Sequence, residues 1–449
     1  MNLEEIFNQK RTENGDIAFT KINDNNLLNL LFLTEYYQNH LSEVQIGKTD
    51  KEQLFARFVR DPRFGLGRRD LGRVLMHQSG CSIDDIVKSG RVDDLFVYDS
   101  KRRDYCIDAD VLDYLKREIE NGNELVKKWM PRYSSKNLLI ARQIAKHWGM
   151  TKQQYGHFIK CNTTENKLSR KTTDEIKFDH VPSLAMIKYF NRFEKGEDTK
   201  ERFAKYLEDV RSGKKELKIA TTTVYDIYRN REKIDPVMFF DKIEKIKINA
   251  IPIVDTSGSM CDSNDSIGKA YAIGHYIAKC STYAPNKVIT FSSRPSLLTL
   301  GEENVYTDGW YGTENRKQNL SKFKNQYERE IQSMYTGDCS NTDFGKVMTL
   351  LKDLDDMPEY LVILSDMEFD CGSCQSKDEL ERLWKANGYT TKIVWWNLNS
   401  RNITVPEMDK NGNIYMSGYS PMLLKFLEVG FDGNAFLNKL LDEYKKSVG

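Results

Sequence analysis

The stretch "IPIVDTSGSMCDS", residues 251–263, decides the fold of the second half of this chain. An apolar run ends abruptly at Asp255, and hydroxyl and carboxylate side chains follow it at once. Such a turn has three interpretations: it holds a catalytic nucleophile, it cradles a metal ion, or it is a polar loop after a strand. The sequence around it separates them.

The apolar run is the first of several. From about residue 246, short β-branched and aromatic runs alternate with helical stretches. Near-continuously apolar strands that alternate with helices predict a parallel sheet covered on both faces. We therefore expect residues 246–449 to form a doubly wound α/β domain. The predicted strands are 249–254, 287–291, 360–364 and 391–396, and the predicted helices are 266–281, 342–354 and 376–388.

The polar residues after these strands should meet at one edge of the sheet. Ligands of doubly wound sheets bind outside the carboxyl ends of the strands, at the point where the strand order reverses. Alternate residues of an extended turn point the same way, so Asp255, Ser257 and Ser259 can converge. Two further oxygen-rich loops should reach this edge, 337–345 and the end of the strand in 360–370. Hard oxygen ligands of this kind suit Mg²⁺ or Mn²⁺.

The motif "DTSGSM" resembles the Asp-x-Ser-x-Ser signature of the metal-ion-dependent adhesion site (MIDAS) of von Willebrand factor A-type domains. The resemblance covers roughly residues 246–449. It implies a Mg²⁺ or Mn²⁺ ion in an incomplete shell, with a position open to an Asp or Glu of a protein partner. The ligands that it implies are Asp255, Ser257, Ser259, Thr342 and Asp366.

The sequence gives less support to catalysis. A hydrolase elbow has the pattern Gly-x-Ser-x-Gly, whereas Ser257 and Ser259 flank a single glycine. None of the six histidines falls in these loops, and His275 lies in the helix that follows. A metal-dependent nuclease needs more carboxylates than this set supplies, and we expect no enzymatic activity. Further carboxylates nearby are Asp262, Asp343 and Glu368.

The first half has a different periodicity. Up to about residue 245 the apolar residues recur at helical spacing between short polar turns. Thr151 is a good N-cap, directly after Gly149 has ended the preceding helix. We expect an all-helical domain over residues 1–245, built as HEAT-like stacked helix pairs without a fixed period. Its predicted helices include 25–38, 50–61, 68–80, 108–122, 135–149 and 199–213.

Four more segments carry a second resemblance: "FDHVPSLAMIKYF" (178–190), "VITFSSRP" (288–295), "IVWWNLNSR" (393–401) and "SGYSPMLLKFL" (417–427). They resemble an uncharacterised family in which a helical half precedes an A-type domain. That layout is similar to the Ro (TROVE) ribonucleoproteins, whose helical repeats bind non-coding RNA. The resemblance implies a Ro-like protein that binds structured or misfolded RNA. The alternative is an adaptor that grips a partner carboxylate through the MIDAS metal.

A basic segment in the helical half suits an RNA partner. Residues 127–171 hold eleven Lys or Arg against one acid, Glu165, which gives +10 in a chain of net charge +1. Trp129, Tyr133 and Tyr155 are interleaved and can stack on unpaired bases. Alternatively, this is a solvated helix face and the aromatics are core. The candidate RNA-binding residues are Lys127, Lys128, Arg132, Lys136, Arg142, Lys146, Lys152, Lys160, Arg170 and Lys171.

Cysteines lie in the same loops as the expected metal ligands. Cys371 and Cys374 have a spacing used for zinc, and Cys261 and Cys339 complete a possible Zn²⁺ site. The alternative is a set of free thiols scattered in loops.

Bulk properties set the context. The 449 residues suffice for two or three domains. No apolar run approaches the roughly 18 residues that a membrane span needs. The polar N-terminus lacks the apolar core of a signal peptide. We expect a cytoplasmic monomer without a membrane partner.

Overall fold

The computed structural model divides the chain into two compact units. The sheet unit comprises Met1–Tyr36 and Thr222–Lys439, and the helical unit comprises Tyr37–Thr221 and Leu440–Gly449. The structure describes the chain except for residues 1–8, 12–16, 20–25, 33–36, 38–39, 63, 100–103, 107, 135–136, 162–163, 171, 220–221, 292–293, 308–314, 337–345, 348–349, 352–356, 367–383, 385, 387, 400–406, 409–411, 419–422, 424–425, 427–432 and 449.

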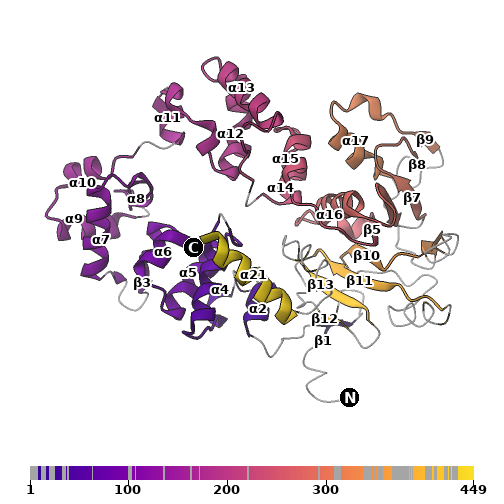
Figure 1. The fold of residues 1–449 in the computed structure, drawn as a ribbon, viewed down its shortest axis with the longest axis horizontal. Helices are drawn as coiled ribbons and strands as arrows, with labels where there is room; N and C mark the ends of the chain where they lie inside the picture. Colours follow the sequence, from indigo (N-terminus) through magenta and orange to yellow (C-terminus); the bar gives the residue numbers. More distant parts are fainter. Residues whose placement is uncertain are drawn as a thin grey trace. The chain divides into compact units, whose positions relative to one another are not determined.

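A mostly parallel sheet forms the centre of the sheet unit. Its described strands have the order β12-β13-β11-β10-β5-β6-β7, in which the two edge strands β7 and β12 are antiparallel (Figure 1). The chain passes outward from β5 through β6, then from β10 outward the other way, so the order reverses between β5 and β10. The predicted doubly wound, mostly parallel sheet is confirmed. The strands are β5 (Ala250–Asp255), β6 (Lys287–Phe291), β7 (Ser296–Thr299), β10 (Tyr360–Ser365), β11 (Lys392–Asn397), β12 (Glu407–Met408) and β13 (Ile414–Ser417).

Both faces of this sheet are covered, which explains its apolar strands. Every residue of β5 and of β10 is buried. On one face α16 (Ser266–Cys280) packs closely, because Gly274 leaves room for the strand. A Cβ atom on Gly274 would lie 2.5 Å from Cγ2 of Val254. On the other face, Ile253, Ile363 and Trp395 belong to one hydrophobic cluster.

A buried ionic cluster joins two helices of the sheet unit. Glu330, on α17 (Gln326–Ser333), accepts hydrogen bonds from His275 Nε2 at 2.7 Å and Lys279 Nζ at 2.9 Å, both on α16. Burial by itself raises the pKa of this carboxyl, but the hydrogen bonds from His275 and Gln326, the charge of His275 and the Lys279 contact lower it to about 2. Glu330 is therefore ionised at neutral pH and holds α16 against α17.

The sheet unit also contains elements from both ends of the chain. Two helices that precede the sheet, α14 and α15, pack on α16 and α17 respectively. The remaining elements are β1 (Gln9–Arg11), β2 (Ile17–Phe19), α2 (Asn26–Phe32), α14 (Val224–Asn230), α15 (Pro236–Lys242), η5 (Gly258–Met260), β8 (Val305–Thr307), β9 (Asn315–Lys317), η6 (Leu320–Lys322) and the first turns of α21 (Gly433–Val448).

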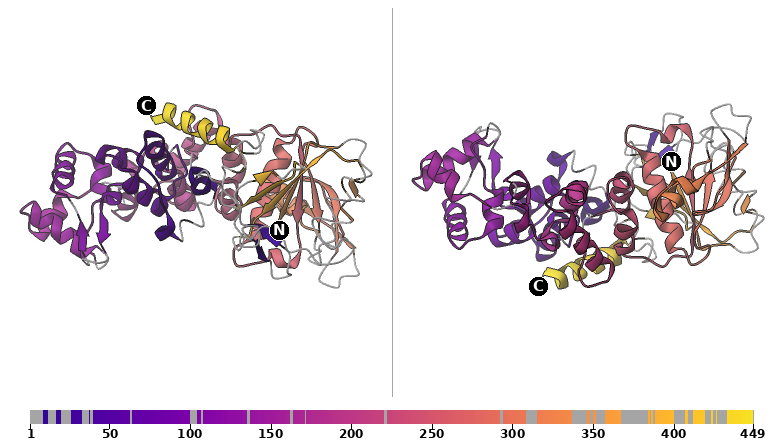
Figure 2. Two further views of the ribbon diagram at one scale, coloured as in Figure 1. Left: turned by 90° about the horizontal axis from the view of Figure 1, so that it is seen from below. Right: turned by 90° about the horizontal axis from the view of Figure 1, so that it is seen from above.

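The helical unit consists of short amphipathic helices in which sequence neighbours pack together, such as α4 with α5 and α12 with α13 (Figures 1 and 2). The predicted helical half is confirmed, and the sequence did not predict its short hairpin β3–β4. Its elements are η1 (Leu41–Glu43), α4 (Asp50–Arg60), α5 (Arg69–Ser79), α6 (Ile83–Ser89), η2 (Val92–Leu95), β3 (Val97–Asp99), β4 (Asp104–Cys106), α7 (Ala109–Glu120), α8 (Glu124–Trp129), α9 (Leu138–His147), α10 (Lys152–Phe158), α11 (Thr164–Arg170), η3 (Thr173–Glu175), η4 (Phe178–His180), α12 (Ser183–Lys195) and α13 (Lys200–Arg211).

Local signals explain where these helices begin and end. Thr151 caps α10 and forms a capping box with Gln154, as the sequence predicted for a helix start at this threonine. Thr49 does the same for α4 with Glu52. Gly149 follows α9 with a φ of +63°, a conformation that glycine adopts without a steric penalty.

Two polar contacts fix the core of the helical unit. Arg60 and Asp94 form a fully buried ion pair, with Nη2 and Oδ2 2.6 Å apart. Tyr444, in the last turns of α21, donates a hydrogen bond to Asp61 Oδ2 at 3.2 Å, and its hydroxyl oxygen lies 3.3 Å from Ser89 Oγ. The C-terminal residues therefore belong to the core of this unit. Across the described part of the chain, no helix has the length and apolarity that a membrane span requires.

Candidate functional site

The candidate metal site lies where the strand order of the sheet reverses. Asp255 is the last residue of β5, and Asp366 directly follows β10. The two strands are parallel neighbours with Val254 paired to Leu364, so both carboxylates reach the same edge of the sheet. This is the edge at which doubly wound folds bind their ligands.

The "DTSGSM" turn brings its oxygen atoms together. Asp255 Oδ1 accepts a hydrogen bond from the backbone N–H of Ser257 at 2.9 Å. The hydroxyl oxygens of Ser257 and Ser259 lie 3.1 Å apart. The predicted convergence is therefore present, although Ser259 lies in the 3-10 turn η5 and not in an extended turn. Ser257 is buried and Ser259 is exposed, so this oxygen cluster runs from the interior of the unit to its surface.

Ser365 is a partner of Asp255 that the sequence did not identify. Its hydroxyl donates a hydrogen bond to Asp255 Oδ2 at 2.6 Å. The position was visible directly after the predicted strand 360–364, beside Asp366, but the contact depends on β10 lying next to β5. Ser365 thus orients the Asp255 carboxylate and leaves Oδ1 toward the turn.

The electrostatics of Asp255 suit a cation. Burial raises the pKa of this fully buried carboxyl, and the nearby charge of Asp366 raises it further, to about 7. Asp366 itself is only 4% exposed. Two buried carboxylates side by side disfavour their own ionisation unless a positive charge lies between them. With the hydroxyls of Ser257 and Ser259, they form a hard oxygen set that fits Mg²⁺.

The rest of the predicted ligand set lies outside the described residues. Thr342 is among them, as are Asp343 and Glu368. The metal assignment therefore stays a prediction, supported by Asp255, Ser257, Ser259 and Asp366.

Among the described residues, no histidine is hydrogen-bonded to Ser257 or Ser259. His275 is on α16, as expected, where its Nε2 is hydrogen-bonded to Glu330 and its ring contacts Phe240 and Tyr327. It is therefore held away from the role of base for Ser257 or Ser259. Asp262 has a structural contact, because its Oδ1 accepts a hydrogen bond from the backbone N–H of Ser266 at the start of α16.

The zinc prediction is not tested by these residues. Cys261 is exposed, and Cys339, Cys371 and Cys374 lie outside the described residues. Within the described part of the chain, no group of three or more His, Cys, Asp or Glu side chains is arranged to hold a metal ion.

The basic segment forms an exposed surface on α9 and α10. Arg142 and Lys146 are both exposed on one face of α9, as their spacing predicted. Lys152, the first residue of α10, and Lys160, two residues after its end, are exposed as well. Among the described residues, no carboxylate forms an ion pair with any of these four side chains. We call these four residues the α9–α10 basic surface.

Other cations of the segment are already engaged. Lys127 pairs with Glu124 at 3.0 Å, and Lys128 approaches Glu165 at 4.0 Å. Arg132 donates a hydrogen bond to Cys161 Sγ at 3.2 Å. Arg170 is the last residue of α11, its side chain is not described, and Lys136 and Lys171 lie outside the described residues.

The aromatic residues of the segment are mostly structural. Tyr155 is fully buried, and its hydroxyl donates a hydrogen bond to the carbonyl of Pro131 at 2.8 Å. It cannot stack on a base, so of the two alternatives the core position holds for this residue. Trp129 lies under the Arg91 guanidinium at 3.8 Å, and Tyr133 packs against Tyr155.

Comparisons with known proteins match two segments of the chain to families of unknown function. Two family models match the chain, one described as a domain of unknown function (DUF7788) over residues 249–443 and the other (DUF2828) over residues 154–248. No curated protein matches it by sequence.

The solved structures that are similar to the chain include the following two. The Ro (RSR) protein of Deinococcus radiodurans is 10% identical, with a TM-score of 0.39, and the match covers 95% of this chain and 94% of that one. Proximal thread matrix protein 1 of the mussel byssus is 14% identical, with a TM-score of 0.26 and coverage of 42% and 48%. Both TM-scores are below 0.5, so neither likeness bears on function.

Proposed function

We propose that this chain is a non-enzymatic, Ro-like RNA-binding protein whose helical unit holds structured or misfolded non-coding RNA. The observation that supports the proposal is the α9–α10 basic surface, four exposed cations without a carboxylate partner in the described structure. Exposed cations in such a cluster attract polyanions because they repel one another until a counter-charge is bound. RNA is preferred over DNA because of the resemblance to the Ro ribonucleoproteins.

Phosphate contacts determine how this binding should depend on salt. Each phosphate that a Lys or Arg neutralises releases condensed counterions, so the logarithm of the affinity falls linearly with the logarithm of the salt concentration. The slope is roughly −0.7 to −0.9 for each contact, so four contacts give a slope of about −3. The slope of this salt dependence therefore gives the number of phosphate contacts, whichever RNA is used.

The test is charge reversal on the exposed face of α9. We expect Arg142→Glu with Lys146→Glu to lower RNA affinity at least tenfold and to make the salt slope shallower by about 2. The matched control is Lys445→Glu with Lys446→Glu, the same charge change at exposed positions of the helical unit. Unchanged affinity in the first variant, or an equal loss in the control, contradicts the assignment.

The A-type domain would hold Mg²⁺ in this proposal. Asp255, Ser257, Ser259 and Asp366 would be its ligands, together with Thr342 by resemblance. The metal would supply a positive charge at the edge of the sheet. Asp255→Ala should leave RNA affinity within about twofold, because the variant changes no residue of the basic surface. No Mg²⁺-dependent cleavage of the bound RNA is expected, and cleavage would favour a nuclease instead.

One observation supports a second candidate function, an adaptor that binds a partner carboxylate through the metal. Ser259 is exposed whereas Asp255 and Asp366 are buried, so an ion held by the three would have a side open to solvent. A partner Asp or Glu would complete the shell. In this case a partner should be retained in Mg²⁺, released by EDTA and lost with Asp255→Ala, whereas RNA affinity should be unchanged.

A further inference from the structure

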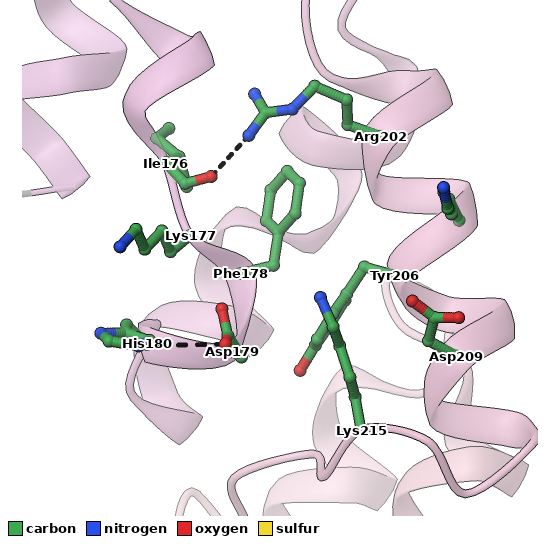
Figure 3. Close-up of a pocket in the computed structure, with 10 residues that line it drawn as sticks. Ile176, Lys177, Phe178, Asp179, His180, Arg202, Tyr206, Asp209 and Lys215 are labelled. Atoms are coloured by element: carbon green, nitrogen blue, oxygen red, sulfur yellow. Dashed lines mark hydrogen bonds and ion pairs between the residues drawn. The ribbon is translucent and has the colours of Figure 1, made fainter.

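A pocket in the helical unit has features that neither the basic surface nor the metal site explains. It has a volume of about 540 Å³ and lies between the segment around η4 and helix α13 (Figure 3). Pockets that bind small molecules commonly have volumes of about 300–1,000 Å³. Its lining comes from Ile176 to Lys215, which follows the basic segment 127–171 in the sequence.

Two aromatic rings form the base of this pocket. Phe178, from η4, and Tyr206, from α13, have ring centroids 5.7 Å apart at an interplanar angle of 36°. Both are largely buried, at 6% and 3% exposure, so they are fixed in place. Rings this buried form the floor of the pocket and leave little face for stacking, so a planar group of a ligand would stack on an exposed guanidinium plane.

A fixed guanidinium lies next to these rings. Arg202 donates hydrogen bonds to the carbonyl oxygens of Thr173 at 2.8 Å and Ile176 at 2.7 Å, and its Cζ lies 5.5 Å from the centroid of the Phe178 ring (Figure 3). Two carbonyls thus hold the plane of the guanidinium, while the side chain remains exposed. The position of its charge is fixed before a ligand binds, so little side-chain entropy is lost on binding.

Three lysines at the pocket have no acidic partner. Lys177, Lys205 and Lys215 are exposed, and no described carboxylate forms an ion pair with any of them. Lys215 lies over the Tyr206 ring at 5.8 Å, from where a bound phosphate can draw it away. Three ammonium groups around one pocket suit a phosphate group.

Two carboxylates give the pocket acceptors as well. Asp179 and Asp209 line it and are half-buried. Burial, and then the charge of Asp179, raise the pKa of Tyr206 to about 12, which places Asp179 near the phenol. A site for phosphate alone has no use for carboxylates beside it, whereas the exocyclic amines and ring N–H groups of a nucleobase need acceptors.

We propose that this pocket binds a nucleotide unit, with the base stacked on the Arg202 guanidinium beside the buried Phe178 and Tyr206 rings, and the phosphate at Lys205 and Lys215. The unit is either a free nucleoside 5′-monophosphate or the 5′-phosphorylated end of an RNA strand. These two sources present the same base, ribose and phosphate. The inference rests on the pocket and not on the α9–α10 basic surface.

Calorimetric titration of the full chain tests both halves of the ligand. Adenosine 5′-monophosphate should bind at least tenfold more tightly than ribose 5-phosphate, which lacks the base, and adenosine, which lacks the phosphate. Equal affinity for ribose 5-phosphate would mean a nonspecific basic patch and would overturn the proposal. So would the absence of binding at millimolar nucleotide.

Matched variants locate the binding. Lys205→Ala with Lys215→Ala should weaken the nucleotide at least tenfold, without unfolding the protein because both side chains are exposed. The control, Lys195→Ala with Lys200→Ala, removes two exposed lysines of α12 and α13 that do not line the pocket. An equal loss in both variants refutes the site.

A competition experiment identifies the source of the nucleotide. A short RNA with a 5′-phosphate displaces bound nucleotide if the site takes strand ends, and it leaves the nucleotide in place if the site takes free nucleotide. Either result presupposes the pocket. Arg142→Glu with Lys146→Glu keeps the two proposals apart, because it should lower RNA affinity and leave the affinity for adenosine 5′-monophosphate unchanged.

Discussion

Replacing Asp255 by Asn should have opposite effects on stability with and without Mg²⁺. The substitution removes the charge and nearly preserves the shape of a fully buried side chain. An amide can still accept the hydrogen bond from the Ser257 N–H, and Ser365 can turn its hydroxyl to accept from the new NH₂ group. What changes is one negative charge next to Asp366.

The structure gives the magnitude for the metal-free protein. A pKa raised from 3.8 to about 7 corresponds to a free-energy cost of about 4 kcal/mol for the ionised carboxylate. Because the folded pKa is raised, this group contributes stability that is present below its ordinary pKa and is lost as the pH rises to about 7. The amide of Asn forms weaker hydrogen bonds than the carboxylate, and we take this to offset about half of that free-energy cost. We therefore expect Asp255→Asn to be about 2 kcal/mol more stable than wild type in EDTA.

Mg²⁺ should reverse this order. A ligand that binds the folded state at one site stabilises it by about 1.4 kcal/mol for each tenfold rise in concentration above Kd. Wild type should follow this slope, and Asp255→Asn should show none, because Asn supplies no charge to the ion. In a domain of this size each kcal/mol shifts Tm by roughly 2–4 °C.

Scanning calorimetry is the suitable measurement, because two compact units can give two transitions and only the one that contains the sheet should respond. Asp241→Asn is the matched control, an exposed carboxylate of the sheet unit that should leave the Mg²⁺ slope unchanged. A wild-type protein that does not respond to millimolar Mg²⁺ or Mn²⁺ would refute the metal assignment. A slope kept by Asp255→Asn would refute the role of Asp255 in it, and a variant less stable than wild type in EDTA would refute the cost assigned to the buried charge.

Three further predictions concern packing and buried charge. Because the pKa of Glu330 is lowered to about 2, its contribution to stability is present above pH ~4.5 and lost as the pH falls toward ~2. Discounted for the solvent near its lysine partner, this contribution is about 2 kcal/mol at pH ~7. Glu330→Gln should remove it in urea unfolding at pH ~7 but not at pH ~2. Asp94→Ala should destabilise the helical unit by about 3–5 kcal/mol, since it leaves the buried Arg60 charge without its partner. Adding Arg60→Met should recover much of the lost stability. Chemical denaturation measures both effects. Gly274→Ala should lower stability by about 1–2 kcal/mol, because the new Cβ meets Val254, although alanine is the better helix former. Val254→Ala in the same chain should relieve this clash. Both changes in stability are measured as shifts in Tm.

The sequence predicted the local structure because local structure depends on neighbours within a few residues. The period of the apolar residues located α4, α5, α9 and α13, and Thr151 marked a helix start through its own hydroxyl. The buried strands β5 and β10 were visible as apolar runs, since both of their faces are covered. The "DTSGSM" turn was readable as a metal cradle because its three oxygen side chains alternate over five residues.

Contacts between distant segments required the tertiary structure. Ser365 reaches Asp255 because β10 pairs with β5 in one register, which no local pattern specifies. Tyr155 is core although its neighbours in the sequence are basic and polar, because Trp148 and Tyr133 pack around it. The pocket was missed for the same reason, since Phe178 and Tyr206 are far apart in sequence and their approach depends on how η4 lies against α13.

What the sequence determined and what the tertiary structure decided therefore differ in the sequence separation of the residues involved. By itself the sequence determined a helical half, a doubly wound sheet and the turn at Asp255, because each depends on periodicity or on a short motif. The tertiary structure alone decided which carboxylates and hydroxyls meet at the edge of the sheet, which cations stay exposed on α9 and α10, and that a pocket forms beside α13. Those outcomes depend on packing between distant segments, which no local sequence pattern specifies.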